Sequence, residues 1–431
     1  MLKFILISIQ LILLFSITIF LISNSFNVSF DIGDLSYSFS SNLLFIFLTI
    51  IILVIFFLNY AYFKTKFIFR KYSLSKKISK TQKGYDYFVD AMISLLNKDN
   101  KNAIISANKM RGLLKNETSL NLLLQSEILK IEKKSQQLNE IYDLMIKNSK
   151  TKTLGYRGLM EECLKQQDYH HAFIYGEKLF LLNPKIEKLY ETLINIIAKT
   201  KNWNQLISIT DRAYSQKIIM KEEANENKSI ALFEIAKIKM KSDSSESIKL
   251  IEKAISMKKN FPPYISLHLQ ILFLINDTTK IQKILKKYWS DSPSSVLRTS
   301  ITSVLKESDI NEITFIKNLI TRNQNNEESK KLLIDFAIYF NEWTIARETI
   351  KGLIGSNPSR ELCLFMSAIE LGETNNVQKS EGWKLRANNA ELDNYWVCKI
   401  TNNPQKDWSP LSDSGHFNSL EWRQPKMLSI L

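Results

Sequence analysis

The chain of 431 residues is poor in the residues that interrupt regular secondary structure, with only 11 glycines and 8 prolines. It also has only three cysteines, Cys163, Cys363 and Cys398, which lie far apart. An odd number of dispersed cysteines provides no disulfide framework and fits a reducing compartment. The motifs G-x-x-x-x-G-K-[ST], G-x-G-x-x-G and H-E-x-x-H are all absent. Nucleotide-binding loops and zinc-hydrolase helices are therefore not indicated, and we expect no enzyme.

Histidine is equally scarce, with four residues in the whole chain. His170 and His171 are adjacent, and adjacent residues point about 100° apart on a helix, so the pair is poorly suited to hold one ligand. His268 lies in the apolar stretch YISLHLQILFL, where a packed histidine is expected. We therefore predict no cofactor and no metal.

Basic residues outnumber acidic ones by 58 to 43, which gives a formal net charge of +15. This excess makes a negatively charged partner or surface plausible. The lysines are spread along the chain, and no nucleic-acid-binding motif accompanies them. We predict that the protein does not bind nucleic acid.

Two uncharged apolar runs stand near the N-terminus, at residues 4–23 and 43–63, and each is long enough to cross a membrane as a helix. Residues 24–42 between them contain Asp31 and Asp34 but no lysine or arginine. Six basic residues follow the second run: Lys64, Lys66, Arg70, Lys71, Lys76 and Lys77. Because cytoplasmic flanks carry excess positive charge, we predict a two-span anchor over residues 1–71 with an exported loop and a cytoplasmic N-terminus. A cleaved signal peptide is the alternative for the first run, but the run is long and lacks an A-x-A-like site.

Residues 72–390 show apolar residues at helical spacing in segments with short polar breaks, which is typical of helical repeats. The clearest unit runs from Tyr156 to Lys185. It matches the tetratricopeptide pattern at five positions: Tyr156, Leu159, Ala172, Gly176 and Pro184. The small residues allow the two helices of a pair to cross closely, and the proline ends the second helix.

The same pattern returns about five periods of about 34 residues later, at Ala346, Ile350, Leu353 and Pro358. Weaker copies between and around these units suggest eight or nine helical pairs over residues 82–390. The predicted fold class is therefore all-α, with two transmembrane helices followed by a cytoplasmic solenoid. The first helices of the pairs would line a groove of the kind that binds peptides or partner proteins.

The C-terminal segment 391–431 holds three of the seven tryptophans, namely Trp396, Trp408 and Trp422, together with Cys398 and Phe417. The order of these features resembles the HemY family of proteobacterial inner-membrane proteins. The features are two membrane spans, basic residues after the second span, tetratricopeptide repeats and this tryptophan-flanked cysteine segment. Many members pair W-x-C-x-x-C with a later C-x-x-C-G-x-F-x-x-L-E-W. This chain keeps the tryptophans, Cys398, Gly415, Phe417 and the LEWR run of residues 420–423, but has Thr401, Leu411 and Ser414 at the other cysteine positions.

The resemblance implies a bacterial inner-membrane scaffold associated with haem biosynthesis, rather than the flavin-dependent oxidase that shares the family's name. A flavin oxidase would need a dinucleotide-binding glycine motif, which is absent. Protein partners, specifically haem-pathway enzymes, are expected. Two alternatives stay open: a haem or porphyrin carrier that uses the groove or Cys398, and an envelope-assembly adaptor like the tetratricopeptide proteins with a rubredoxin-like tail.

A tetrahedral zinc site needs four ligands, and here Cys398 is accompanied only by His416, which stands outside the ligand positions of the family pattern. We therefore expect no structural zinc. A terminal repeat needs a cover over its apolar face. Residues 391–431 are predicted to form a short irregular cap, related to a zinc ribbon, over the last helical pair around Trp383 and Leu385.

Overall fold

The structure is a computed structural model that describes residues 12, 15–20, 23, 27–306, 312–391 and 393–425. The chain divides into two compact units, residues 1–132 and 133–431. Most of the predicted first membrane span, residues 4–23, lies outside the described residues.

The first unit begins with a β-hairpin of strands β1 (Asn27–Ile32) and β2 (Leu35–Ser40), closed by a turn in which Gly33 has a φ of +64°. The hairpin leads directly into α2 (Ser41–Leu96), which is followed by α3 (Asn100–Leu113) and α4 (Thr118–Ile131). The end of α2 packs with α3 and α4 through a small buried cluster: Ala91, Ala107, Met110, Leu114 and Leu124.

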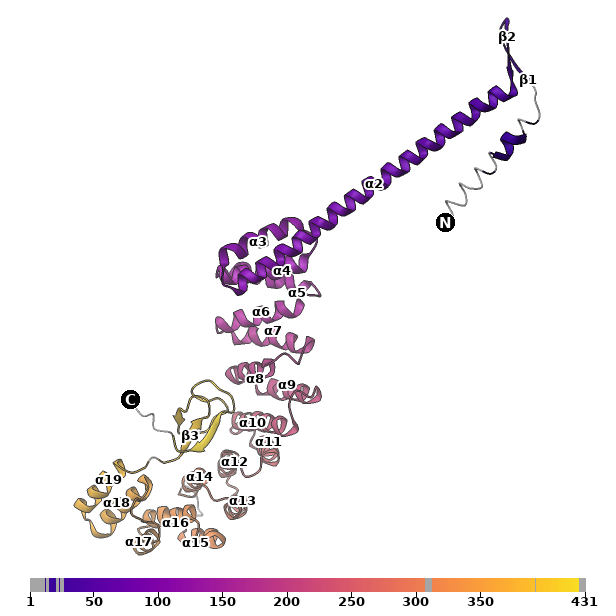
Figure 1. Ribbon diagram of the computed structural model, residues 1–431. Helices are drawn as coiled ribbons and strands as arrows, with labels where there is room; N and C mark the ends of the chain where they lie inside the picture. Colours follow the sequence, from indigo (N-terminus) through magenta and orange to yellow (C-terminus); the bar gives the residue numbers. More distant parts are fainter. Residues whose placement is uncertain are drawn as a thin grey trace. The chain divides into compact units, whose positions relative to one another are not determined.

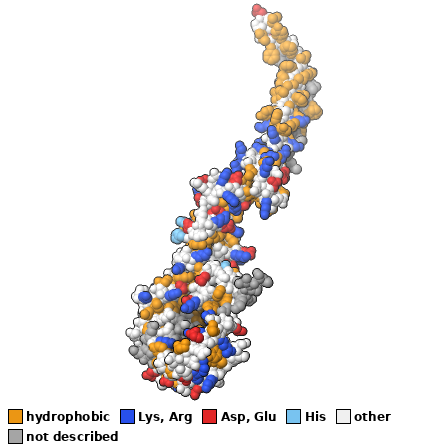
Figure 2. Space-filling view, turned by 90° about the vertical axis from the view of Figure 1, so that its left-hand side faces the viewer, with side chains coloured by type: hydrophobic (Ala, Val, Ile, Leu, Met, Phe, Trp, Pro, Cys, Tyr) orange, Lys and Arg blue, Asp and Glu red, His pale blue; other side chains and the backbone are white. Residues whose placement is uncertain are grey.

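Helix α2 contains the second predicted span, residues 43–63, and continues without a break past the predicted boundary at residue 71. Among the described residues it is the one helix that is long and apolar enough to cross a membrane. Figure 2 shows hydrophobic side chains gathered along this helix and lysine and arginine side chains where the apolar part ends. The described residues thus contain one candidate span, whereas two were predicted for the chain.

The second unit is an array of antiparallel helices joined by short turns (Figure 1). Its helices are α5 (Ser135–Lys147), α6 (Lys152–Lys165), α7 (Tyr169–Leu182), α8 (Leu189–Thr200), α9 (Trp203–Ser215), α10 (Lys221–Lys239), α11 (Ser244–Met257), α12 (Pro262–Leu274), α13 (Thr278–Asp291), α14 (Ser295–Lys306), α15 (Ile313–Ile320), the short 3-10 helix η1 (Thr321–Asn323), α16 (Glu327–Tyr339), α17 (Trp343–Lys351), α18 (Arg360–Thr374) and α19 (Val377–Asn388). The prediction of a helical-repeat body is confirmed.

The repeat period is visible in hydrogen bonds between successive first helices of the pairs. Ser229 of α10 bonds the Tyr264 hydroxyl of α12 at 3.0 Å, and the two residues are 35 positions apart. Ser300 of α14 donates to Ser266 of α12 at 2.7 Å, across 34 positions. We call the side of the array formed by α6, α8, α10, α12, α14, α16 and α18 the first-helix face.

The turns inside several pairs use the same local chemistry. Asp168 begins α7 and Asp277 begins α13, and each carboxylate accepts a hydrogen bond from a backbone N–H in the first turn. The residues before them, Gln167 and Asn276, have left-handed backbone conformations. Each such N-cap stabilises its helix by about 1 kcal/mol and reverses the chain within a few residues.

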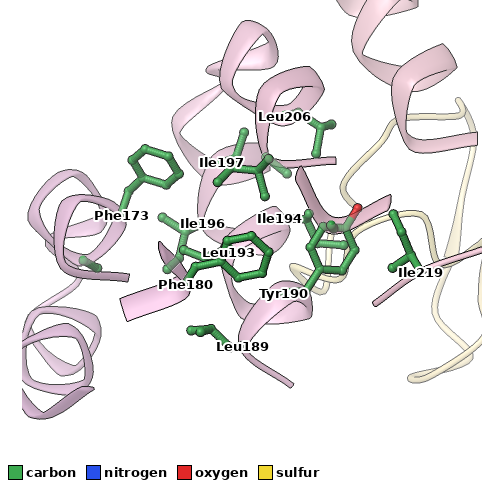
Figure 3. Packing of buried hydrophobic residues seen from close by; sticks show 14 of the residues in the cluster. Phe173, Phe180, Leu189, Tyr190, Leu193, Ile194, Ile196, Ile197, Leu206 and Ile219 are labelled. Atoms are coloured by element: carbon green, nitrogen blue, oxygen red, sulfur yellow. The ribbon is translucent and has the colours of Figure 1, made fainter. Parts of the chain in front are cut away.

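Small residues lie where the helices cross most closely. Ala172 of α7 is fully buried, and a Cβ atom on Gly176 would lie 2.7 Å from Leu193 and 2.9 Å from the sulfur of Met160. Ala346 of α17 is also fully buried. Figure 3 shows the core at this point, with Phe180 of α7 beside Leu193 of α8.

The other residues of the predicted repeat pattern occupy the ends and cores of the same pairs. Leu159 is buried in α6, and the ring of Tyr156 lies 6.5 Å from that of Tyr175. Pro184 follows the end of α7, and Pro358 stands just before α18.

His268 of α12 has 4 % of its surface exposed, and its Nδ1 atom has no hydrogen-bond partner in the described part of the chain. Burial, aided by the positive charge of Lys280, lowers the pKa of His268 to about 4, although Glu252 stands 3.9 Å from Nε2. Because the unfolded residue titrates near 6.5, the unfolded state binds more protons than the folded state between about pH 6.5 and about pH 4. The free energy of unfolding should therefore decrease by about 2–3 kcal/mol as the pH falls over this interval.

We therefore expect His268→Leu to reduce acid destabilisation, measured by urea unfolding at pH 7 and pH 4.5. His170→Gln, which changes an exposed histidine, is the control and should leave the pH dependence unchanged. Equal losses of stability in the His268 variant and the unaltered chain would show that His268 does not cause the acid sensitivity.

Candidate functional site

The C-terminal residues 393–425, which we call the C-terminal module, contain an antiparallel sheet in the order β4-β3-β5. Its strands are β3 (Tyr395–Cys398), β4 (Pro404–Gln405) and β5 (Leu420–Arg423). The prediction of an irregular cap is therefore wrong: a small sheet organises the segment. The segment could not be recognised as a sheet because β3 and β5 have only four residues each and lie about twenty residues apart.

The position predicted for the cap is also wrong. The module lies on the first-helix face in the middle of the array (Figure 1), where the Trp408 ring contacts Phe233 of α10 at 5.3 Å, Phe261 at 5.2 Å and Tyr264 of α12 at 5.9 Å between centroids. Trp383 instead packs with the core of α16–α18, and Leu385 is 65 % exposed. The physical reason is that α10 and α12 present the aromatic rings that the tryptophans can pack against.

A second set of contacts holds the module to α8. The backbone N–H of Phe417 donates to the side-chain oxygen of Asn195 at 3.0 Å, across 222 positions of sequence. The side chains of Leu411 and Phe417 pack against the buried cluster of α7–α10. Val296 of α14 packs against the buried cluster of Trp396, Cys398 and Leu420, so the module reaches from α8 to α14.

The four positions of the family's cysteine pattern do not form a metal site here. Leu411 packs toward the helices, whereas the hydroxyls of Thr401 and Ser414 lie 2.8 Å apart and hydrogen-bond to each other. This bond joins the loop after β3 to the loop before β5. Among the described residues, no group of three or more His, Cys, Asp or Glu is placed to hold a metal.

Cys398 is a buried thiol with several hydrogen-bonding groups around it. Its side chain is fully buried, and its sulfur lies 3.3 Å from the Ser419 hydroxyl. Burial raises the pKa of the thiol, but hydrogen bonds from Ser419, from Thr401 and from the Ile400 backbone outweigh this effect and lower the pKa to about 6. One thiol is too few for a structural zinc ion, which needs four ligands.

Between the module and the first-helix face lies an open cleft of about 500 Å³. Its apolar lining is mostly aromatic, from Phe261, Trp396, Trp408 and Trp422, with Pro262, Val296 and Leu420 beside them. Its polar lining comprises Glu226, Lys258, Ser294, Lys399, Asn418, Glu421 and Arg423. Aromatic side chains with a few charged groups around them are typical of protein-interaction sites.

The charges at the inner end of the cleft are paired. Lys258 forms an ion pair with Glu226 of α10, and its ammonium group stands 4.2 Å from the centroid of the Phe261 ring. Burial raises the pKa of Glu226, but the Lys258 ammonium, a hydrogen bond from Asn418 and the charge of Lys399 outweigh this and lower it. Glu226 is therefore a carboxylate that ties α10 to the module.

At the outer end, positive charge is in excess. Lys399 and Arg423 share one carboxylate, that of Glu421, at 3.1 Å and 3.8 Å. Arg423 also donates to the Asn402 side chain at 2.9 Å. A ligand that carries an acidic group would complete the charge balance here.

Strand β5 forms one edge of the sheet, and among the described residues its backbone is paired only with β3. The N–H of Cys398 donates to Asn403 on the β4 side, while the N–H of Lys399 donates to Ser419 on the β5 side. Since these directions alternate along antiparallel strands, the backbone groups of Leu420 and Trp422 point away from β3. All four β5 residues are among those that line the cleft, so this edge borders it.

The groove predicted from the repeats is thus partly covered by the chain's own C-terminal module. Sequence reasoning identified the three tryptophans but missed four residues of the repeats. Phe233 and Phe261 contact the tryptophan rings, Asn195 accepts a hydrogen bond from Phe417, and Glu226 pairs with Lys258. These four residues belong to helices whose apolar spacing does not distinguish them from ordinary repeat positions, so no local signal marked them.

The other residues singled out from the sequence do not contribute to the cleft. His170 and His171 are exposed, and His171 bonds Asp168 at 2.7 Å. Cys163 is half-buried and Cys363 is buried. No feature of these residues favours the haem-carrier alternative.

The fold and cleft define a helical-repeat protein whose C-terminal sheet is docked on its own repeats. No family model and no curated protein matches the chain. Among solved structures, it is similar to a chain in a Naa15/Naa10 complex bound to HypK-THB, with 13% identity over 73% of this chain and a TM-score of 0.41. The match covers half the length of that chain.

Two smaller repeat proteins also align with it. One is a tetratricopeptide repeat protein from Parabacteroides merdae, with 11% identity, 58% of this chain and 93% of that chain covered, and a TM-score of 0.29. The other is the TPR2AB domain of yeast Sti1 in complex with pHSP90, with 11% identity, 71% and 98% covered, and a TM-score of 0.31.

Proposed function

We propose that this chain is a membrane-anchored adaptor that holds a protein partner in the cleft between the C-terminal module and the first-helix face. The observation that carries the proposal is the free edge of β5 beside an aromatic cleft. An unpaired strand edge offers backbone donors and acceptors that an extended peptide can satisfy.

The chemistry of the edge defines the segment that would bind. Residues of the peptide facing inward would meet Trp422 and Phe261, which favours apolar side chains at alternate positions. Residues facing outward would lie near Lys399 and Arg423, which favours acidic side chains between the apolar ones. The preferred ligand is an extended segment in which apolar and acidic residues alternate.

Helix α2 supplies the anchor in this proposal. The basic residues after residue 63 would keep the repeats on the cytoplasmic side of a bacterial inner membrane, where excess positive charge is retained. The resemblance to the HemY family supports late haem-biosynthesis enzymes as the partners. An adaptor of this kind would concentrate them at the membrane surface without taking part in their chemistry.

Affinity purification of the tagged full-length chain from detergent-solubilised membranes tests the proposal. We expect haem-pathway enzymes to be enriched over an unrelated two-span bait. Enrichment of other proteins alone would contradict the haem assignment while leaving the adaptor function intact. If no protein is enriched, the adaptor function itself is wrong.

Charge reversal locates the binding site. Arg423→Glu should reduce partner recovery about fivefold, because an attractive cross-strand pair becomes a repulsive one. Lys406→Glu reverses an exposed charge of the same module away from the cleft and should leave recovery unchanged. If the two variants retain the partner equally, the partner does not bind at the β5 edge.

A further inference from the structure

The β-hairpin before α2 has two chemically different faces. In the β1–β2 register, Phe30 lies opposite Tyr37 and Ile32 lies opposite Leu35, while Asp31 lies opposite Ser36. Since side chains alternate between the faces of a strand, one face carries Phe30, Ile32, Leu35, Tyr37 and Phe39. The other face carries serine and aspartate residues: Ser29, Asp31, Ser36 and Ser38.

The apolar face has no cover among the described residues. Exposure of its five side chains runs from 42 % at Phe39 to 75 % at Ile32, and the rings of Tyr37 and Phe39 stack at 6.5 Å between centroids. A two-stranded hairpin is marginally stable in water on its own. An exposed apolar patch of this kind indicates a surface that binds to something apolar.

The connection to α2 places the hairpin near the end of the apolar run. Strand β2 ends at Ser40 and α2 begins at Ser41, so no linker separates the two. A strand of six residues is only about 20 Å long. If α2 crosses the membrane, the hairpin therefore starts at the membrane surface and can reach no more than about 20 Å from it.

We propose that the hairpin lies flat on the exported surface of the bilayer, with its apolar face in the headgroup region and its aspartate–serine face toward water. This inference rests on the proposed membrane anchoring by α2. Tyrosine and phenylalanine suit this depth, because their rings sit well at the boundary between headgroups and acyl chains. The hairpin would bury one apolar face at the membrane interface, as an interfacial amphipathic helix does.

The charges of the segment specify which lipids are needed. Residues 24–42 carry Asp31 and Asp34 and no basic residue. Attraction to anionic headgroups therefore cannot hold the hairpin, so apolar contact must. We expect the same placement in pure phosphatidylcholine and in mixtures with phosphatidylglycerol, and no weakening at high salt.

Spin labels on neighbouring residues test the two faces. The background is the full-length chain with Cys163→Ser, in which the two remaining cysteines are buried and should not be labelled. Labels at Tyr37→Cys and Ser38→Cys would point to opposite sides of the hairpin. After reconstitution in phosphatidylcholine vesicles, the label at position 37 should be accessible to oxygen and shielded from a water-soluble nickel complex. The label at position 38 should show the reverse.

A third label at Phe57→Cys, on an exposed position of α2, separates the possible failures. If position 57 is not in lipid, the membrane anchoring by α2 is wrong. If position 57 is in lipid while positions 37 and 38 are equally accessible to nickel, only the hairpin inference is overturned. Spin–spin broadening at position 37 that disappears on dilution with unlabelled protein would identify a second copy as the partner, and would also overturn the inference.

Discussion

Substitution of Trp408 by alanine should release the C-terminal module from the repeats. The Trp408 ring contacts three aromatic rings of the first-helix face, those of Phe233, Phe261 and Tyr264. Removal of a large packed aromatic side chain costs about 3–5 kcal/mol when it is fully buried. Since Trp408 is half-buried, we expect about 2–3 kcal/mol, lost mainly from docking rather than from the helices.

Hydrogen exchange of the full-length protein measures this effect segment by segment. Exchange should become faster in residues 395–423 and on the facing parts of α10 and α12, with little change in α16–α19. Trp383→Ala is the matched control, because Trp383 packs with the α16–α18 core. It should loosen that core and leave the module docked. The opposite result, release of the module by the Trp383 variant, would support a cap over the last helical pair.

Replacement of Arg298 by alanine should have the largest effect on the stability of the repeats. Arg298 of α14 is 6 % exposed and forms ion pairs with Glu328 of α16 and Glu361 of α18. Lys331 joins the same network, at 2.8 Å from Glu327 and 3.4 Å from Glu361. Without the guanidinium group, half-buried carboxylates would lose their main counter-charge, at a cost of about 3–5 kcal/mol.

Urea unfolding followed by circular dichroism, together with hydrogen exchange in α14–α18, would measure this loss. Arg157→Ala is a suitable control, because the Arg157–Glu161 pair is solvent-exposed and such pairs contribute about 0–1 kcal/mol. Adding Glu328→Gln and Glu361→Gln to the Arg298 variant should recover part of the stability. An Arg298 variant no less stable than the Arg157 variant would show that the network is not needed to hold these helices together.

The helical repeats could be predicted because their determinants are local. Apolar spacing, Ala172 and Ala346 at the close crossings, and prolines between helices all act within one pair of helices, so about 34 residues of sequence contain the information. The hydrogen bonds between residues 34 or 35 positions apart follow from the same period. The second apolar run could likewise be predicted as a candidate span, since length and absence of charge suffice to define one.

The site could be predicted only in part. Tryptophan and cysteine are rare in this chain, so their concentration near the C-terminus indicated a distinct segment. The departure from the cysteine pattern indicated that metal ligands are missing there. The hydrogen bond between Thr401 and Ser414 was not foreseen, because a serine or threonine in a loop does not reveal which other hydroxyl it will meet.

Local sequence patterns are enough to establish a helical-repeat body, an apolar helix ahead of it and a tryptophan-rich end without a full set of metal ligands. Where that end docks, and what cleft it creates, could be learned only from the three-dimensional structure. The reason is physical: Phe417 bonds a residue 222 positions away. A contact between two separately formed surfaces depends on their shapes in space, and no local pattern in either segment records it.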